Sequence, residues 1–287
     1  MFKLKNTHPF VNIRTFFISI IIVSLSSCEK NENIQEIPSY ISIEYVNLET
    51  ISNQGSNTHN ITDVWLYVND QFRGAYELPA TIPILQKDSN NLKIFAGIKD
   101  NGITSTRVRY HFYKSYEKDV FLVEDSVIEI IPTFSYTNNS IIESENFEGV
   151  GTNIDTTLSS EIDFEVITEN GNKLAYVLIS GGDYVFEAAT EDFEGLPQAG
   201  SPVYLELDYQ SNHTALIGAY INYSQAVVNK DLVWVSPKEE WNKIYINMTK
   251  TVSEAINNNS IKFYLNIFRS DTTEDAWMKF DNLKIIY

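Results

Sequence analysis

The chain has 287 residues, and its 38 acidic and 21 basic side chains give it a formal charge of −17. An acidic protein of this kind, without a cluster of lysine and arginine, is a poor partner for nucleic acid or for an anionic lipid surface. The single cysteine excludes an internal disulfide, so stability must come from buried cores, for which 43% hydrophobic residues are sufficient.

Residues 1–27 have the pattern of an export signal. A positively charged start precedes a short apolar run at residues 16–23, which is well below the roughly 20 residues that a membrane-spanning helix needs. The segment Leu25-Ser26-Ser27-Cys28 follows and resembles the lipobox of bacterial lipoproteins. The resemblance implies cleavage before Cys28 and a diacylglyceryl group plus an N-acyl chain on this residue. The alternative is an ordinary signal peptide, cut near Ser27, that leaves Cys28 as a free thiol.

Residues 28–38 are predicted to form a short acidic tether. They begin with the charged and polar segment Glu29-Lys30-Asn31-Glu32-Asn33. This segment, together with the frequent use of asparagine, isoleucine, lysine and tyrosine, resembles surface lipoproteins of Bacteroidota that have no known function. The resemblance implies a lipid-anchored protein of the outer membrane that faces the cell surface rather than the periplasm.

Residues 39–136 alternate between apolar and polar side chains in short runs separated by turn residues. The expected strands cover residues 40–46, 64–68, 71–78, 80–85, 92–98, 107–113, 120–123 and 127–131. Asn69-Asp70 and Asn101-Gly102 are expected at tight turns, because these residue types tolerate a positive φ. Several short strands at regular spacing, without a helical repeat, predict a β-sandwich or a small barrel, and of these we expect an Ig-like β-sandwich.

Part of this first half resembles the small β-domains called PEGA. The likeness lies in the strand and turn from Val64 to Gly74 and in the segment Leu78-Pro79-Ala80-Thr81-Ile82-Pro83 that precedes the next strand. The resemblance implies a spacer or an interaction module rather than an active site. We place the domain boundary in the polar, turn-rich segment at residues 137–141.

Residues 142–287 alternate again and are predicted to form a second all-β domain. Three segments resemble the jelly-roll fold of carbohydrate-binding modules: Asn146-Phe147-Glu148-Gly149, the strand from Trp241 to Thr249, and the closing strand from Phe280 to Tyr287. The resemblance implies a jelly-roll β-sandwich but does not specify a ligand, because jelly rolls host many functions. The predicted fold is therefore all-β, with an N-terminal β-sandwich followed by a C-terminal jelly roll.

Outward-facing aromatic residues are the candidate ligand contacts, because an exposed ring can stack on the apolar face of a pyranose. Trp277, Trp234 and Tyr220 each alternate with apolar neighbours in a predicted strand, so each side chain points away from the core. The alternative is that they are isolated exposed aromatics of the kind that folded proteins commonly have. The other two tryptophans, Trp65 and Trp241, are predicted to lie in the core.

The resemblance to carbohydrate-binding modules also implies a structural calcium ion between the first and last strands of the jelly roll. Glu145 or Glu148 would supply the carboxylate of the first strand, and Asp281 that of the last. Hard oxygen ligands of this kind suit Ca²⁺. The alternative is that these acids are solvated strand ends.

The sequence contains no catalytic motif. His59, His111 and His213 lie far apart in unlike contexts, and there is no nucleophile elbow, zinc-binding helix or phosphate loop. We expect a membrane-anchored, non-enzymatic protein of the cell envelope that binds a polysaccharide at the cell surface. The first alternative is a structural or assembly lipoprotein that contacts an envelope protein. The second is a glycoside-active enzyme, because facing carboxylates cannot be recognised in a sequence.

Overall fold

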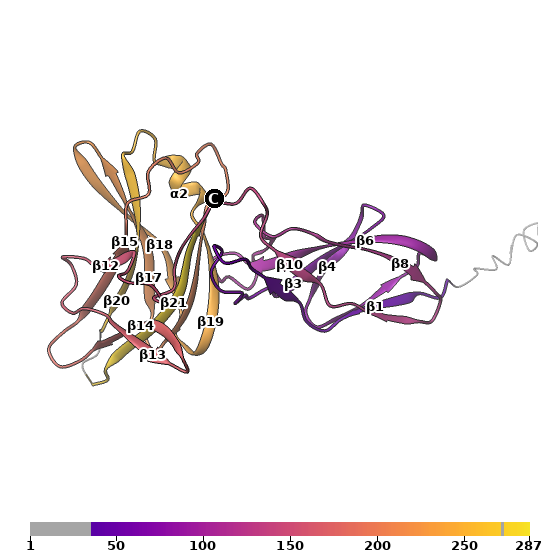
Figure 1. The fold of residues 1–287 in the computed structure, drawn as a ribbon, viewed down its shortest axis with the longest axis horizontal. Coiled ribbons are helices and arrows are strands. Elements are labelled where there is room, and N and C mark those ends of the chain that lie inside the picture. Colours follow the sequence, from indigo (N-terminus) through magenta and orange to yellow (C-terminus); the bar gives the residue numbers. More distant parts are fainter. Residues whose placement is uncertain (1–35, 271–272) are drawn as a thin grey trace, which may run out of the picture. The chain divides into compact units, whose positions relative to one another are not determined.

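The computed structural model describes residues 36–270 and 273–287. The export signal, the lipobox and Cys28 therefore lie outside the described residues. Residues 38–287 form one compact unit whose regular secondary structure is almost entirely β-strand (Figure 1), so the predicted all-β fold is confirmed. The helix α2 (Thr249–Glu254) is the one α-helix of the described part. Within that part, no helix has the length and hydropathy that crossing a membrane demands.

Strands β1 to β10 form the N-terminal sandwich, residues 38–136. They are β1 (Ser39–Ile43), β2 (Asn47–Glu49), β3 (Asp63–Val68), β4 (Gln71–Glu77), β5 (Ala80–Ile84), β6 (Asp88–Lys99), β7 (Arg107–Arg109), β8 (Tyr116–Leu122), β9 (Val127–Glu129) and β10 (Thr133–Ser135). One set of strands has the orders β5-β1-β9 and β10-β2, and the other has the order β4-β3-β6-β7 with β8 also paired to β6. Every second side chain of a strand points into the space between the two sets of strands and fills it. In β3, for example, Val64, Leu66 and Val68 are fully buried.

Both turns that the sequence predicts in this sandwich are present. Asn69 and Asp70 have φ values of 49° and 60° and join β3 to β4, which is the left-handed geometry of a tight hairpin. Asn101 and Gly102 have φ values of 55° and 71°. The backbone N–H of Asn101 donates to the carbonyl oxygen of Tyr245 at 2.9 Å, so this second turn is held against the C-terminal half.

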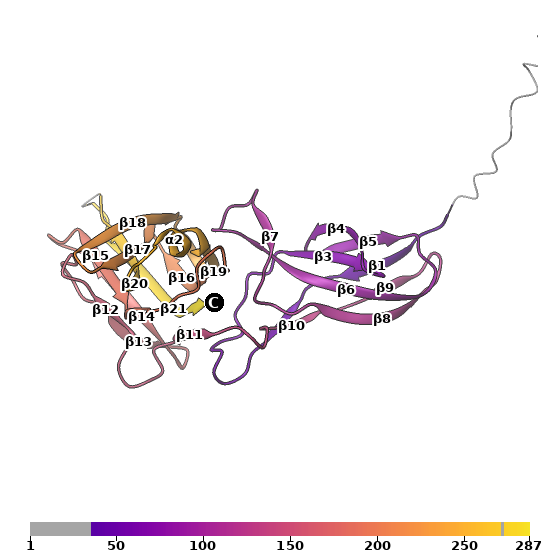
Figure 2. The same ribbon diagram turned by 90° about the horizontal axis from the view of Figure 1, so that it is seen from above.

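The C-terminal sandwich, residues 142–287, has the two sheets of a jelly roll. Its strands are β11 (Ile142–Glu145), β12 (Ile154–Thr156), β13 (Glu165–Glu169), β14 (Asn172–Ile179), β15 (Val185–Thr190), β16 (Tyr204–Ser211), β17 (Ala215–Tyr223), β18 (Ala226–Val235), β19 (Lys238–Asn247), β20 (Ser260–Phe268) and β21 (Ala276–Ile286). The β21 sheet has the order β13-β14-β21-β16-β19, with β11 also paired to β21, and the β17 sheet has the order β12-β15-β20-β17-β18. The sheets form two layers (Figure 2) around a core that includes Phe147, Phe186, Phe263 and Phe280.

The hydrophobic core of the N-terminal sandwich extends onto the outer face of the β21 sheet. The core cluster of the N-terminal sandwich includes Tyr204 of β16, Tyr245 of β19 and Ile286 of β21. The ring of Tyr110 packs edge-on against both of these tyrosines, at centroid distances of 5.2 Å and 4.9 Å. Because these contacts make residues 38–287 one compact unit, the predicted division into two domains at residues 137–141 stays a prediction.

Charged side chains are buried at this junction, on the outer face of the β21 sheet. Glu206 is 0% exposed and accepts hydrogen bonds from the hydroxyls of Tyr110 (2.8 Å) and Tyr136 (2.9 Å). The ammonium group of Lys243 lies 3.4 Å from Glu206 and 3.2 Å from Asp208. Burial, and then the charge of Glu206, raise the pKa of Tyr110 well above its ordinary value, so its hydroxyl remains a donor. Each buried charge therefore has partners, which is the condition under which such burial is tolerated.

We expect Lys284 to make stability depend on pH above neutrality. Its fully buried ammonium group donates to the carbonyl oxygen of Ser56 at 2.7 Å and to the hydroxyl of Tyr136 at 3.2 Å. Burial lowers the pKa of Lys284 from 10.5 to about 8. Between these two values the unfolded chain binds more protons than the folded protein, so the free energy of unfolding falls as the pH drops through this range, by up to about 3 kcal/mol.

Chemical denaturation of the wild type and of Lys284→Met at a series of pH values from about 7 to about 10 measures this contribution. The difference in free energy of unfolding, wild type minus variant, should rise with pH. A difference that stays constant over the range would show that Lys284 does not titrate in this way.

Candidate functional site

The outer face of the β17 sheet brings together two of the three predicted ligand contacts. Leu216 and Tyr220 of β17 lie on this face, because the residues that alternate with them are in the core. Trp234 of β18 pairs with Leu216, so it lies on the same face, and it is 63% exposed. The positions of Trp234 and Tyr220 are therefore ~13 Å apart along the strands, at about 3.3 Å per residue.

The third predicted contact, Trp277, lies on the other sheet. It pairs with Leu178 on the outer face of the β21 sheet and is half-buried. Alternation points it out of the core, as predicted, but toward the opposite side of the sandwich from Tyr220 and Trp234. The structure therefore does not bring Trp277 together with the other two.

Two tyrosine rings lie side by side on the outer face of the β17 sheet. Tyr264 of β20 is the cross-strand neighbour of Gly218, where a Cβ atom would overlap the tyrosine ring. The ring therefore extends across β17, and its hydroxyl donates to Asn229 (2.9 Å) and Asp231 (2.7 Å) of β18. The ring of Tyr220 lies 4.8 Å from that of Tyr264, at an interplanar angle of 37°. We call this pair of rings the tyrosine platform; Tyr264 is 2% exposed, so Tyr220 supplies its accessible surface.

Glu187 of β15 fixes one side of the tyrosine platform. Its carboxylate accepts hydrogen bonds from the hydroxyls of Tyr220 and Thr157, both at 2.6 Å, and from the amide of Asn266 at 3.3 Å. Burial, followed by the hydrogen bond to Glu187, raises the pKa of Tyr220 to about 12. The hydroxyl therefore stays protonated and keeps its bond at neutral pH, so the ring is held in place before any ligand arrives.

Polar side chains continue the face beyond Tyr220. Lys262 of β20 pairs with Tyr220 across the sheet, and its ammonium group lies 3.3 Å from the carboxylate of Asp192. The amide of Asn222 donates to the same carboxylate at 2.8 Å and to the hydroxyl of Ser260 at 2.9 Å. The face thus combines flat aromatic rings with a border of hydrogen-bonding groups, which is the usual composition of a site that binds polar organic ligands.

Gly218→Ala is expected to disrupt the tyrosine platform. The added methyl group would overlap ring and hydroxyl atoms of Tyr264, so the ring must shift away from its hydrogen bonds to β18. We expect a loss of about 1–3 kcal/mol in the free energy of unfolding, typical of overpacking, measured by urea denaturation. Ligand affinity should fall with it. Gly182→Ala is the matched control, because a Cβ there meets nothing within 4 Å; equal losses in both variants would contradict the role of Gly218.

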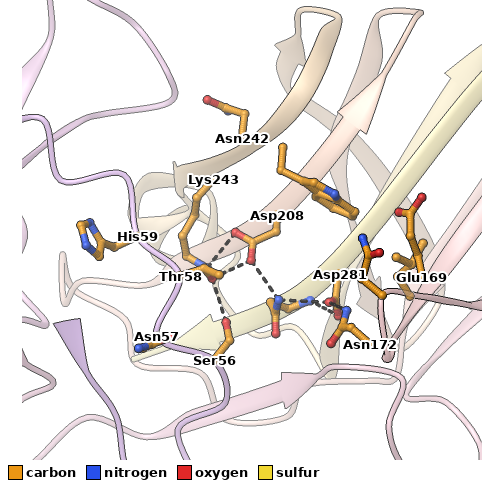
Figure 3. A pocket seen from close by; sticks show the side chains of 14 residues that line it. Ser56, Asn57, Thr58, His59, Glu169, Asn172, Asp208, Asn242, Lys243 and Asp281 are labelled. Atoms are coloured by element: carbon orange, nitrogen blue, oxygen red, sulfur yellow. Dashed lines mark hydrogen bonds and ion pairs between the residues drawn. The ribbon is translucent and has the colours of Figure 1, made fainter. Parts of the chain in front are cut away.

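A second hollow lies between the 56–59 loop of the N-terminal sandwich and the outer face of the β21 sheet (Figure 3). This cavity, of about 650 Å³, is called the junction pocket, and the β13–β14 hairpin forms another wall. Its floor is a hydrogen-bonded chain in which Asp208 accepts from the hydroxyl of Thr58 (2.6 Å) and the amide of Asn282 (2.9 Å). Asp281 in turn accepts from the amide of Asn172 at 2.8 Å.

Trp241 lines the junction pocket, so the prediction that it belongs to the core is wrong. It is 44% exposed. In β19 the side chains of Ile244 and Ile246 lie in the core. Trp241 and Lys243 stand at the alternate positions of the strand, which face the other way. The side chain therefore lies on the outer face of the β21 sheet.

Trp65 also lies outside the core, contrary to the prediction. It is a half-buried residue of β3 on the face opposite to Val64 and Leu66. Its ring stacks with that of Phe72 at a centroid distance of 5.6 Å, and the guanidinium group of Arg109 lies 5.9 Å from the centroid of the indole ring. These contacts, rather than a core, hold the indole in place.

The three predicted calcium ligands have other partners in the structure. The carboxylate of Glu145 accepts two backbone N–H groups at 2.6 Å, and that of Glu148 accepts the backbone N–H of Lys173 at 2.7 Å. Burial raises the pKa of Asp281 to about 6, which weakens it as a cation ligand. Among residues 36–270 and 273–287, no group of three or more acidic, histidine or cysteine side chains is arranged to hold a metal ion. The calcium site stays a prediction that these contacts do not support.

Sequence reasoning missed Glu187, Tyr264 and Gly218. Strand alternation would have indicated the first two, because each stands between two core residues of its strand. The signal for Gly218 is the glycine itself, since a glycine inside a strand often marks the close approach of another group. None of these residues belongs to a motif, so only their shared face connects them.

No protein-family model and no curated protein matches the chain. Among solved structures, the chain is similar to the CBM22-2 xylan-binding domain of Xyn10C from Paenibacillus barcinonensis, with 13% identity and a TM-score of 0.37 over 50% of this chain and 97% of that one. It is also similar to the family 11 carbohydrate-binding module of the cellulase Lic26A-Cel5E from Clostridium thermocellum, with 13% identity and a TM-score of 0.35 over 49% and 91% of the two chains. A mutant family 29 module complexed with mannohexaose gives 12% identity and a TM-score of 0.34 over 52% and 92%.

Proposed function

We propose that this chain is a non-catalytic protein that binds a neutral polysaccharide on the outer face of the β17 sheet. The observation that carries the proposal is the tyrosine platform, which is clamped by Glu187 and lies on the same face as the exposed Trp234. A pyranose presents a flat apolar face and a rim of hydroxyl groups. A flat ring bordered by amides and carboxylates complements both features.

The geometry of the face favours an extended chain over a small molecule. Tyr220 and Trp234 occupy positions ~13 Å apart along the strands, at about 3.3 Å per residue, so one polysaccharide chain can contact both rings. The formal charge of −17 works against an acidic polysaccharide. A neutral glycan is therefore the ligand class that this face fits best.

The carboxylates of the face support a binding role rather than a catalytic one. Glu187 and Asp231 each accept a hydrogen bond from a platform hydroxyl, at 2.6 Å and 2.7 Å. They therefore hold the rings of Tyr220 and Tyr264 in position. A glycosidase needs one carboxylate that protonates the leaving oxygen and another that attacks or activates water, and these two are already engaged in orienting rings.

Affinity electrophoresis through gels that contain soluble neutral polysaccharides tests the proposal. We expect at least one of a panel of xylan, glucomannan, galactomannan and mixed-linked β-glucan to retard the wild-type protein. Tyr220→Ala should abolish the retardation, whereas Trp277→Ala, which removes a ring from the other sheet, should leave it unchanged. Wild-type mobility that is the same in every gel would overturn the proposal.

We further propose that a lipid on Cys28 anchors the protein to the outer membrane, facing the cell surface. Support comes from the lipobox-like segment ending at Cys28 and from the acidic tether that follows it. Mass spectrometry of the protein from its native membrane should give a chain that starts at an acylated Cys28. A free thiol, or residues 1–27 still attached, would contradict this anchoring.

A further inference from the structure

We propose that the junction pocket is a second saccharide site, which takes one or two neutral sugar units at the end of a glycan. The pocket and the tyrosine platform lie on different sheets, so the two sites are independent. The cavity of about 650 Å³ falls in the range of small-molecule sites, roughly 300–1,000 Å³. A concave pocket of this size fits a chain end, whereas the open platform fits the middle of a chain.

Trp241 gives the junction pocket an aromatic wall. The indole is 44% exposed although its backbone lies in β19, a strand whose next outward residue, Lys243, is buried at the junction. A half-exposed indole at the side of a pocket offers an apolar surface, and a ligand that covers this surface gains free energy by removing it from water. The apolar face of a sugar ring is a cover of the right shape and polarity.

Amide side chains provide the hydrogen-bonding groups of the pocket. Its lining includes the asparagines Asn57, Asn170, Asn172, Asn242 and Asn282. An amide carries both donors and an acceptor, which matches sugar hydroxyl groups that also donate and accept. The nitrogens of Asn172 and Asn282 already donate within the protein, so these two residues offer their oxygens. The network of Asp208, Thr58 and Asn282 fixes part of this lining in advance, with oxygen–oxygen and nitrogen–oxygen distances of 2.6 Å and 2.9 Å.

Most charged groups of the junction pocket have a partner of opposite charge within the protein, whereas the carboxylate of Asp281 is held by the amides of Asn172 and Asn282, and this arrangement points to a neutral ligand. Lys243 lies 3.2 Å from Asp208 and 3.4 Å from Glu206, so its charge is already compensated. Glu169 lies 2.6 Å from the ammonium group of Lys279. Burial lowers the pKa of His59, which keeps its imidazole uncharged at neutral pH. An ionic ligand would have to compete with these pairs, whereas a polyhydroxylated one would not.

The pocket also gives a reason for the charged junction between the sandwiches. Its 56–59 loop belongs to the N-terminal sandwich, and this loop is tied to the β21 sheet by Lys284, which donates to the carbonyl oxygen of Ser56 at 2.7 Å, and by Thr58. The residues that line the pocket come from both sandwiches, so neither sandwich alone forms the complete pocket. The buried charges on the outer face of the β21 sheet thus hold the loop where the pocket needs it.

Fluorine NMR of the protein labelled with 5-fluorotryptophan tests the second site and separates it from the first. The chain has four tryptophans, and single Trp→Phe variants assign their signals. Titration with xylose, glucose, mannose, galactose, xylobiose, cellobiose and mannobiose at millimolar concentrations should shift the signal of Trp241 while those of Trp65 and Trp277 stay unchanged. Polysaccharide bound to the platform should instead shift the signal of Trp234.

A second measurement uses saturation transfer to the bound sugar. Trp241→Ala should weaken binding of the shifting sugar at least tenfold, Trp241→Phe should restore most of it, and Trp234→Ala should have no effect. Failure of all seven sugars to shift the Trp241 signal, or unchanged affinity in Trp241→Ala, would overturn the junction site and leave the platform proposal standing. A shift at Trp241 without any polysaccharide effect at Trp234 would support the junction site and count against the platform.

Discussion

Replacing Glu206 with alanine is expected to lower the free energy of unfolding by about 3–5 kcal/mol, the largest stability loss that we predict. The carboxylate is fully buried and accepts bonds from the hydroxyls of Tyr110 and Tyr136. It also lies 3.4 Å from the ammonium group of Lys243. Its removal leaves two buried hydroxyls without this acceptor and weakens the compensation of a buried positive charge.

Urea denaturation followed by tryptophan fluorescence measures the effect of Glu206→Ala. Glu239→Ala is the matched control, because this glutamate lies on β19 of the same sheet and is exposed; its effect should stay within about 0.5 kcal/mol. Glu206→Gln, which keeps an acceptor and loses the charge, should fall between the two. Similar stability of Glu206→Ala and the control would show that the junction does not depend on this carboxylate.

The second large effect that we predict is a loss of affinity for the polysaccharide. The double substitution Tyr220→Ala and Trp234→Ala should weaken polysaccharide affinity at least a hundredfold, or about 3 kcal/mol. Each ring contributes a stacking surface, and Tyr220 also covers the buried ring of Tyr264, whose centroid lies 4.8 Å away. Because both rings lie on the outer face of the sheet, the loss of stability should be much smaller than the loss of affinity.

Isothermal titration calorimetry with the polysaccharide that retards the protein gives both affinities. The matched control replaces Trp277 and the exposed Phe121, which removes two rings from other surfaces. Near-wild-type affinity of the Tyr220 and Trp234 double variant, with the control equally unaffected, would remove the platform from the binding mechanism. Single variants show whether the two rings act additively, as expected for separate contacts.

The sequence predicted the fold well because the strands alternate regularly. Short runs in which apolar and polar residues alternate predicted the all-β class. Residue types that tolerate a positive φ predicted the turns at Asn69-Asp70 and Asn101-Gly102. The alternation of apolar and polar residues indicates which side of a strand faces the core. It correctly predicted that Tyr220, Trp234 and Trp277 point away from the core. It does not state which sheet a strand joins, so it could not separate Trp277 from the other two.

The junction could not be predicted for a related reason. By alternation, Glu206, Lys243 and Lys284 face outward from the jelly roll, and an outward charge ordinarily meets water. Here the N-terminal sandwich covers that face, so all three are at most 5% exposed. Trp241 was predicted to lie in the core, although it alternates with the core residues of its strand and faces outward like Lys243. Which outward face becomes covered depends on contacts between distant residues, which no local pattern contains.

Hydroxyl-radical footprinting with and without the bound polysaccharide tests the central proposal most directly, because it reports which rings the glycan covers. We expect oxidation of Tyr220 and Trp234 to fall severalfold when the glycan is bound, while Trp277 and Phe121 react as before. Protection of Trp277 without protection of Tyr220 and Trp234, or no protection of any of them, would contradict binding on the outer face of the β17 sheet.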